Sequence, residues 1–254
     1  MANRPVFLTL ERQPYYSTMN AEFPWAGGFA VSQKQKNIAA MHRCFQLAFP
    51  GKRVLEISSK STEPLGVAAS AFRLTKYVPS LGRSVPVENV FQSAKTFSGG
   101  GPYADLQEAA PIDAKRDPRL STSGELRCFR WEGREYPLIP RTIFYDYVYL
   151  NALLEHPELG DRLAEYDAFT DVVFNPQRSL NCQARSAAIY VSLRRLGLLA
   201  SVPSFEDFLA LFLPAGAPKP PAGPAPLIGE EYEAAGERTL SAAWVTEHCT
   251  LEEE

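Results

Sequence analysis

The sequence predicts an α+β fold, with one compact, mostly helical domain that contains a small sheet and is followed by an extension. Apolar residues recur at spacings of three and four in several long segments, which is typical of helices that cover a core. Shorter apolar runs between these segments suit strands. The two kinds of segment do not alternate strictly, as a doubly wound parallel sheet would require. The predicted domain spans residues 1–212.

The predicted elements follow from these patterns in chain order. Ser32 is a suitable N-cap for the first helix, and Pro50 with Gly51 ends it. Pro86 fits the first turn of the next helix, where no intrahelical N–H is needed. Strands are predicted over residues 6–10, 53–57 and 126–131, and helices over residues 32–49, 84–97, 141–154, 161–166, 182–196 and 205–211.

Residues 213–254 differ in composition from the predicted domain. They begin with a linker rich in proline, alanine and glycine and continue as an acidic tail with little apolar periodicity. We therefore expect a disordered appendage, or at most a short docking helix over residues 242–245.

The overall composition argues against several classes of protein. The net charge is −3, so a nucleic acid would have to be held by a local basic patch or by a specific chemical handle. Four cysteines without a CxxC pair and three scattered histidines predict neither a metal site nor a bound cofactor. No signal peptide and no membrane-length apolar run is present, which indicates a cytoplasmic protein with reduced, mostly buried thiols.

The predicted helix over residues 84–97 carries the most informative side chains. At about 100° per residue, Glu88, Gln92 and Lys95 fall within an arc of roughly 60°, while Val87 and Phe91 lie on a separate apolar arc. A carboxylate can move protons, and a lysine of lowered pKa can add to an electrophilic carbon. The helix is therefore expected to line a small-molecule site. The alternative is an ordinary solvated face with spaced charges.

Two loops add weaker signals. Gly99, Gly100 and Gly101 form a turn whose successive N–H groups would suit a diphosphate, although a flexible connector would have the same composition. Near the start of the chain, Trp25 and Phe29 flank two glycines. This aromatic loop suits either a platform for a base or a packed corner of the core.

At these residues the sequence resembles the NADAR family, which is linked to NAD and ADP-ribose. SVPVENVFQSAK is similar to that family's helix with Glu, Gln and Lys, and AAPIDAKRDPRL is similar to its second Ala-Lys element, with Lys115 and Arg119 in place. Four further segments resemble the subgroup that accompanies DarT-type toxins, which ADP-ribosylate DNA bases. They are EFPWAGGFAVSQKQKNIAAMH, VLEISSKS, FSGGGPYADL and YDAFTDVVFNPQRSLNCQARS.

The resemblance implies an ADP-ribosyl glycohydrolase that needs no cofactor or metal. Its partners would be ADP-ribosylated guanine in DNA, or ADP-ribose, and a cognate DarT-type toxin. Lys95 would form a Schiff base with the anomeric carbon, Glu88 would transfer protons, and Asp105 is a candidate second carboxylate. The residues expected to bind the ligand are Gln92, Ser58, Ser59, Lys60, Gly99, Gly100, Gly101 and Lys115, with Tyr103, Trp25 or Phe29 as the ring that stacks on a base.

Three alternatives remain at this stage. The chain could be an N-glycosidase that acts on small nucleotide or riboflavin-pathway metabolites. It could instead neutralise a toxin by binding it, with the tail as the contact. It could also read ADP-ribose without turnover.

Overall fold

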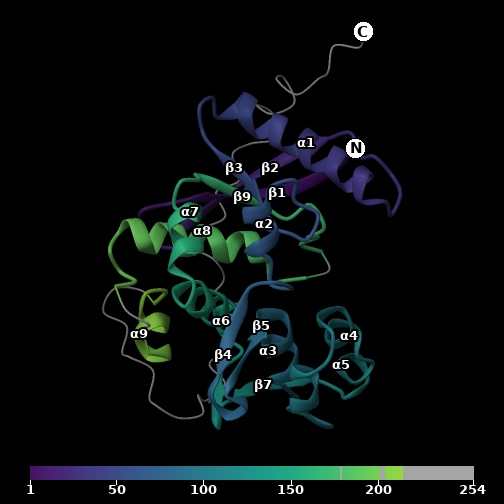
Figure 1. Cartoon of the computed structure of the whole chain (residues 1–254), viewed down its shortest axis with the longest axis vertical. Helices are drawn as coiled ribbons and strands as arrows, with labels where there is room; N and C mark the ends of the chain where they lie inside the picture. Colours follow the sequence, from purple (N-terminus) through teal and green to yellow (C-terminus); the bar gives the residue numbers. More distant parts are fainter. Residues whose placement is uncertain (178, 201–203, 214–254) are drawn as a thin grey trace. The chain divides into compact units, whose positions relative to one another are not determined.

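The computed structural model describes residues 1–177, 179–200 and 204–213, which form two compact units (Figure 1). The first unit comprises residues 1–70 and 158–200, and the second comprises residues 71–157 and 204–213. Both mix helices with small sheets, which confirms the predicted α+β class. The predicted appendage lies, apart from Leu213, outside the described residues. No helix in the described part of the chain is long and apolar enough to cross a membrane.

A four-stranded sheet organises the first unit. Its order is β2-β1-β9-β3, with β3 parallel to β9 and the other neighbours antiparallel. The predicted strands over residues 6–10 and 53–57 are confirmed. Strands β2 and β9 were not predicted from the sequence. The strands are β1 (Ala2–Thr9), β2 (Tyr16–Phe23), β3 (Val54–Glu56) and β9 (Ala168–Thr170).

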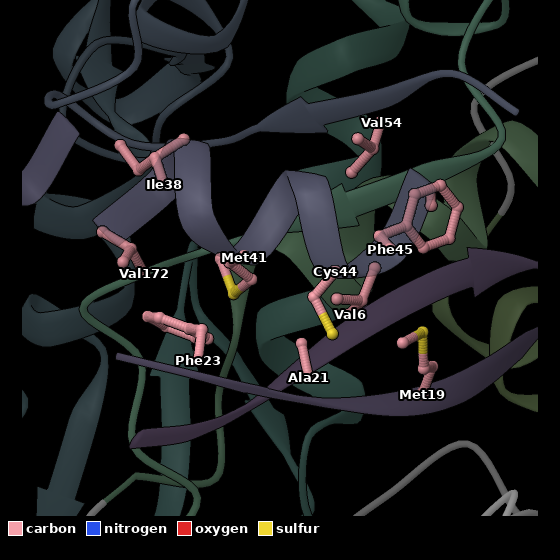
Figure 2. Packing of buried hydrophobic residues seen from close by; sticks show 11 residues of the cluster. Val6, Met19, Ala21, Phe23, Ile38, Met41, Cys44, Phe45, Val54 and Val172 are labelled. Carbon is pink, nitrogen blue, oxygen red and sulfur yellow. The ribbon is translucent and has the colours of Figure 1, made fainter. Parts of the chain in front are cut away.

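Helix α1 (Val31–Ala48) packs on this sheet through the apolar positions that its periodicity predicted. Figure 2 shows Met41 and Phe45 of the helix among Val6, Met19 and other side chains from the strands. The prediction that Ser32 caps the helix was wrong. The helix begins one residue earlier, after Ala30, and no side chain caps it.

The remaining helices of the first unit complete its core. α8 (Gln183–Arg195) contacts β1 and β9 and confirms the predicted helix over residues 182–196. α7 (Pro157–Leu163) begins four residues before the predicted position, because Pro157 is itself suited to a first turn. The short α2 (Pro64–Ala68) follows β3 after a seven-residue loop.

In the second unit, a hairpin of β4 and β5 and a three-stranded sheet of order β6-β7-β8 frame the helices. Its aromatic core includes Phe91, Phe129 and Phe144, with the rings of Phe129 and Phe144 stacked at 4.6 Å. The predicted strand over residues 126–131 and the helices over 141–154 and 205–211 are confirmed. The strands are β4 (Thr75–Val78), β5 (Arg83–Pro86), β6 (Lys95–Phe97), β7 (Leu126–Trp131) and β8 (Arg134–Tyr136). The helices are η1 (Pro79–Leu81), α3 (Val87–Ser93), η2 (Ala104–Gln107), α4 (Pro111–Arg116), α5 (Arg119–Thr122), α6 (Ile143–Leu154) and α9 (Phe205–Ala210).

The predicted helix over residues 84–97 was too long at both ends. Only residues 87–93 are helical, as α3. The segment before it pairs with β4, so Pro86 ends a strand and occupies the N-cap position, without a capping hydrogen bond, instead of lying in the first turn. The segment after it pairs with β7, and the N–H of Arg130 donates to the carbonyl of Ala94 at 2.7 Å. Lys95 is therefore the first residue of β6 and does not belong to the helix.

The three described cysteines, Cys44, Cys128 and Cys182, are buried free thiols, as predicted. Cys249 lies outside the described residues.

Gly66 of α2 lies very close to the end of β3. A Cβ atom at this position would lie 1.9 Å from the carbonyl oxygen of Glu56 and 2.5 Å from Oγ of Ser61. Because the nearest obstacle is backbone, α2 or β3 would have to move to accommodate any larger residue. Gly66 thereby fixes the loop that carries Ser58, Ser59 and Lys60.

We predict that Gly66→Ala lowers the free energy of unfolding by about 1–3 kcal/mol through overpacking, although alanine favours helix formation elsewhere. Chemical denaturation of the full chain measures the change. Gly27→Ala is the matched control, because a Cβ there has nothing within 4 Å. Equal stability of both variants would contradict this account of the contact.

Candidate active site

Glu88 and Gln92 form a buried polar pair on α3. Their residues are 4% and 6% exposed, and Nε2 of Gln92 donates to Oε1 of Glu88 at 2.9 Å. Val87 and Val90, both fully buried, anchor the helix. The N–H of Glu88 donates to the carbonyl of Ala71 at 2.9 Å. The alternative of a solvated helix face was therefore wrong, because this face is covered by protein.

Lys115 of α4 brings a cation to the same carboxylate. Its Nζ lies 3.5 Å from Oε1 of Glu88 and 5.2 Å from the centre of the Phe72 ring. The Lys115 side chain is half-exposed, whereas that of Glu88 is buried. The ion pair therefore joins a partly exposed amine to a carboxylate that is buried in the first turn of α3.

Lys95 approaches the pair from β6. Its backbone pairs with that of Phe129, and its Nζ lies 4.8 Å from the centre of the Phe91 ring. Burial lowers the pKa of Lys95 from its usual 10.5 to about 8, and the positive charge of Lys115 acts in the same direction. The negative charge of Glu88 opposes this and raises the pKa. At pH 8 about half of these amines are neutral, compared with below about 1% for an ordinary lysine.

The amide of Gln92 leaves one acceptor available. A carboxylate can only accept from an amide, so the hydrogen bond to Glu88 fixes the Gln92 nitrogen toward that side chain. Oε1 of Gln92 is buried and has no hydrogen-bond partner among the described residues. An unpaired buried acceptor is costly unless a ligand donates to it.

Asn89 is a site residue that the sequence analysis missed. Its Nδ2 donates to the carbonyls of Leu106 and Ala109 at 2.7 and 2.8 Å. It therefore ties the η2 segment to α3. Its position beside Glu88 was the only feature of the sequence that pointed to Asn89. The residues that accept its hydrogen bonds lie 17 and 20 positions further along the chain, so no local pattern reveals them.

The glycine turn does not present three free N–H groups. The N–H of Gly99 donates to the carbonyl of Ser123 at 2.9 Å, and that of Gly100 donates to the carbonyl of Phe97 at 3.4 Å. The prediction that these two N–H groups bind a diphosphate was wrong, because both already donate to backbone carbonyls of the protein. Gly101 has φ +90°, and a Cβ there would lie 2.4 Å from the Lys95 carbonyl oxygen, so only glycine allows this approach.

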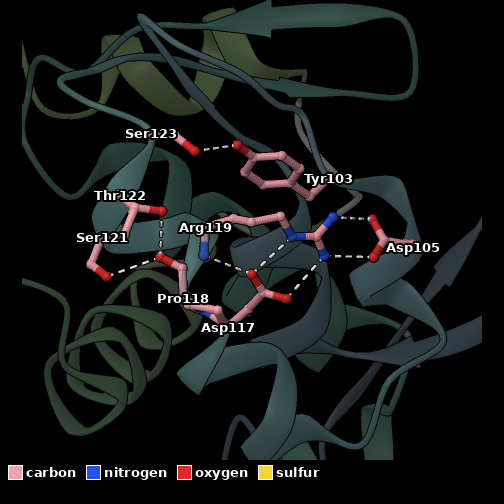
Figure 3. A network of polar contacts seen from close by, with 8 residues as sticks. All are labelled: Tyr103, Asp105, Asp117, Pro118, Arg119, Ser121, Thr122 and Ser123. Atoms are coloured by element: carbon pink, nitrogen blue, oxygen red, sulfur yellow. Dashed lines mark hydrogen bonds and ion pairs between the residues drawn. The ribbon is translucent and has the colours of Figure 1, made fainter.

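Tyr103 and Asp105 belong to a network centred on Arg119 (Figure 3). The guanidinium of Arg119 donates to Asp105 at 2.6 and 3.3 Å and to Asp117 at 2.9 Å, and it lies 4.5 Å from the centre of the Tyr103 ring. The Tyr103 hydroxyl hydrogen-bonds with Ser123. Asp105 is therefore ion-paired with Arg119, and the guanidinium of the same arginine lies against the Tyr103 ring.

The other predicted binding residues belong to the first unit. Ser58 is buried, and its hydroxyl donates to Oε1 of Glu56 at 2.7 Å and accepts from the N–H of Lys60 at 3.1 Å. Ser59 is exposed. Trp25 lies beneath the cationic groups of Arg4 and Lys34.

Glu56 is a second residue that the sequence analysis missed. Besides Ser58, the Thr170 hydroxyl donates to its carboxylate at 2.6 Å and the Val172 N–H donates at 3.0 Å. Burial raises its pKa, and the negative charge of Asp171 does the same. His42 hydrogen-bonds with the Thr170 hydroxyl at 2.8 Å, and burial lowers the His42 pKa to about 4. Thr170 ends β9 and Val172 follows it, so both partners lie more than 100 residues from Glu56 in sequence.

The second unit therefore brings together Glu88, Gln92, Lys95 and Lys115. An amine of lowered pKa, a buried carboxylate and an unpaired amide oxygen suit covalent chemistry at a carbonyl-like carbon. In the described part of the chain, no three His, Cys, Asp or Glu side chains are grouped as metal ligands.

A search of curated proteins returns no match. A family model described as the DarT1-associated NADAR antitoxin matches residues 2–220, which include every predicted site residue. The chain belongs to this family of DarT1-associated NADAR antitoxins.

Proposed function

We propose that the chain is an ADP-ribosyl glycohydrolase that releases ADP-ribose from modified guanine in DNA and so reverses the action of a DarT-type toxin. The observation that carries the proposal is the grouping of Lys95 with Glu88, Gln92 and Lys115 in the second unit, where burial lowers the pKa of Lys95. Such an amine can be a nucleophile at neutral pH. The resemblance and the family description support the choice of substrate.

The reaction begins with the neutral amine of Lys95. Its lone pair attacks C1 of the distal ribose, and the C–N bond to the base breaks. The departing base takes up a proton that Glu88 transfers from the amine. The nitrogen lone pair then expels the ring oxygen, Glu88 transfers the remaining N–H proton from that nitrogen to the oxygen, and a neutral Schiff base remains.

Water completes the cycle. It adds to the imine carbon, and Glu88 transfers a proton from it to the nitrogen. Glu88 then transfers the hydroxyl proton of the adduct to the same nitrogen as the C–N bond to Lys95 breaks, which leaves the neutral amine and an aldehyde at C1. The sugar then recloses. The net reaction consumes one water and yields ADP-ribose and unmodified guanine.

The other two groups have supporting roles. The free Oε1 of Gln92 accepts a hydrogen bond from a ribose hydroxyl, which would satisfy this buried atom. Lys115 lowers the Lys95 pKa and pairs with Glu88 when that side chain is ionised.

We predict that Lys95→Ala lowers the rate of ADP-ribose release from modified DNA by about 10³-fold or more, because the nucleophile is lost. Lys95→Arg keeps the charge but cannot form an imine, so it should be equally inactive. Chromatographic product analysis measures both, with the exposed Lys52 replaced by alanine as the control. Wild-type release by Lys95→Ala would exclude the Schiff-base role. Release from free nucleotide metabolites but not from modified DNA would favour the small-metabolite alternative.

We further predict opposite pKa shifts when the neighbouring charges are removed. Lys115→Gln raises the Lys95 pKa because a repelling cation is lost, whereas Glu88→Gln lowers it because an attracting anion is lost. NMR titration of isotopically labelled lysine measures both without requiring activity. In wild type, release should increase as the pH rises through about 8, because the neutral amine is the reactive form. Shifts in the same direction in both variants would contradict the assigned charges.

A further inference from the structure

The turn that precedes β4 is tied to the start of α3 at both of its ends. The N–H of Val87 donates to the carbonyl of Leu74 at 2.9 Å, and that of Glu88 donates to the carbonyl of Ala71, also at 2.9 Å. Ala71 and Leu74 are buried, whereas Phe72, which follows Ala71, is only partly buried. The turn therefore holds a partly exposed aromatic ring next to the backbone of Glu88.

Lys115 connects the Phe72 ring with the carboxylate of Glu88. Its Nζ lies 5.2 Å from the centre of the ring and 3.5 Å from Oε1 of Glu88. The ring centre therefore lies no further from this oxygen than the sum of the two distances. Because the Lys115 side chain is half-exposed, the ring lies at the end of the ion pair that is open to solvent.

The ring beside Lys95 is less available than Phe72. Phe91 lies 4.8 Å from Nζ of Lys95, but it is only 5% exposed and packs against Phe129 and Tyr145. In the part of the chain that the structure describes, no other aromatic ring packs against Phe72. Phe72 is thus a ring near the site that can still be covered by a ligand.

The proposed mechanism requires the leaving base to lie within reach of Glu88, because this carboxylate transfers the proton that the base takes up. A base stacks readily on an aromatic side chain. Guanine also presents two acceptors on one edge, N7 and O6, to which a lysine can donate. The ammonium group of Lys115 has three donors, so it can contact both the base and the carboxylate.

We propose that the departing guanine stacks on Phe72, while Lys115 donates a hydrogen bond to N7 or O6 of the base. This inference rests on the proposed function, because it assigns the contact with the group that Lys95 displaces. Phe72 moves no proton and forms no bond. It positions the base so that the bond to C1 of the ribose lies between the amine of Lys95 and the ring.

Phe72 was not among the rings predicted from the sequence to stack on a base. Of those rings, Tyr103 lies against the guanidinium of Arg119, whereas Trp25 and Phe29 belong to the first unit, where Phe29 is fully exposed. The contact that marks Phe72 is with α4, far along the chain, so no local pattern reveals it.

The first test measures kcat and KM of the full chain for release of ADP-ribose from ADP-ribosylated deoxyguanosine. Phe72→Ala should raise KM by about 5- to 150-fold with a smaller effect on kcat, because stacking on the base is lost. Phe72→Leu, which stays apolar but lacks a ring, should behave alike, and Phe72→Tyr should restore the wild-type KM. Phe212→Ala is the matched control, since Phe212 is another partly buried ring of the second unit. An equal loss in Phe72→Tyr and Phe72→Ala would assign the ring a purely structural role and overturn the proposal.

The second test measures binding without turnover. Saturation-transfer NMR with deoxyguanosine should give a signal for wild type that Phe72→Ala largely loses, while the signal of ADP-ribose stays the same. Equal deoxyguanosine signals from the two proteins would overturn the proposal. So would a loss of the ADP-ribose signal alone, because the ring would then hold the adenine. If wild type released no ADP-ribose from any substrate, the proposed function would fail, yet this comparison would still decide whether Phe72 binds a base.

Discussion

The cost of burying the charge of Lys95 is the constraint on which the candidate site depends. An ammonium group loses hydration when it is covered by protein, and the structure places it against the Phe91 ring. Glu88 limits the effect because its negative charge favours the protonated amine. Burial and the charge of Glu88 together leave the pKa of Lys95 near 8. Near this pH the amine is neutral about half of the time, so the site does not hold a buried positive charge at all times.

The surrounding structure maintains the pKa of Lys95 by holding the backbone around this residue in place. Pairing with β7 holds Lys95, and the close approach of Gly101 to its carbonyl leaves no room for a larger residue. Asn89 ties the η2 segment to α3. Arg119 joins Asp105 in η2 to α5 and lies on Tyr103, whose N–H donates to the Ser93 carbonyl at 2.9 Å. The ion pair of Arg119 with Asp105 is exposed and contributes little to stability by itself, while the partly buried pair with Asp117 helps to hold the guanidinium in place.

Local patterns predicted the long elements and the residue types of the site. Helices α1, α6 and α8 and strand β7 agree with the periodicity of their segments. Residues 84–97 show where local apolar spacing fails to predict the secondary structure. Their apolar spacing suits a helix, but pairing with β4 and β7 converts both ends into strands, and such long-range partners leave no local signal. The choice of Lys95 rested on the family resemblance, since helical geometry placed it on the wrong element.

The buried networks were beyond the reach of sequence for the same reason. Two partners of Glu56, Thr170 and Val172, come from the end of β9 and the segment after it, and those of the glycine turn include Ser123, which follows α5. The glycines predicted a turn correctly, yet composition could not show that two of their N–H groups are used by the protein.

Locating the covalent adduct tests the central claim most directly. Borohydride reduces a Schiff base and fixes ADP-ribose on the lysine that formed it, after which trypsin cannot cleave at that residue. If Lys95 is the nucleophile, mass spectrometry finds the adduct on a peptide that spans residues 84–115 with Lys95 uncleaved. An adduct on Lys115, or complete cleavage after Lys95 while the enzyme turns over, would contradict the account.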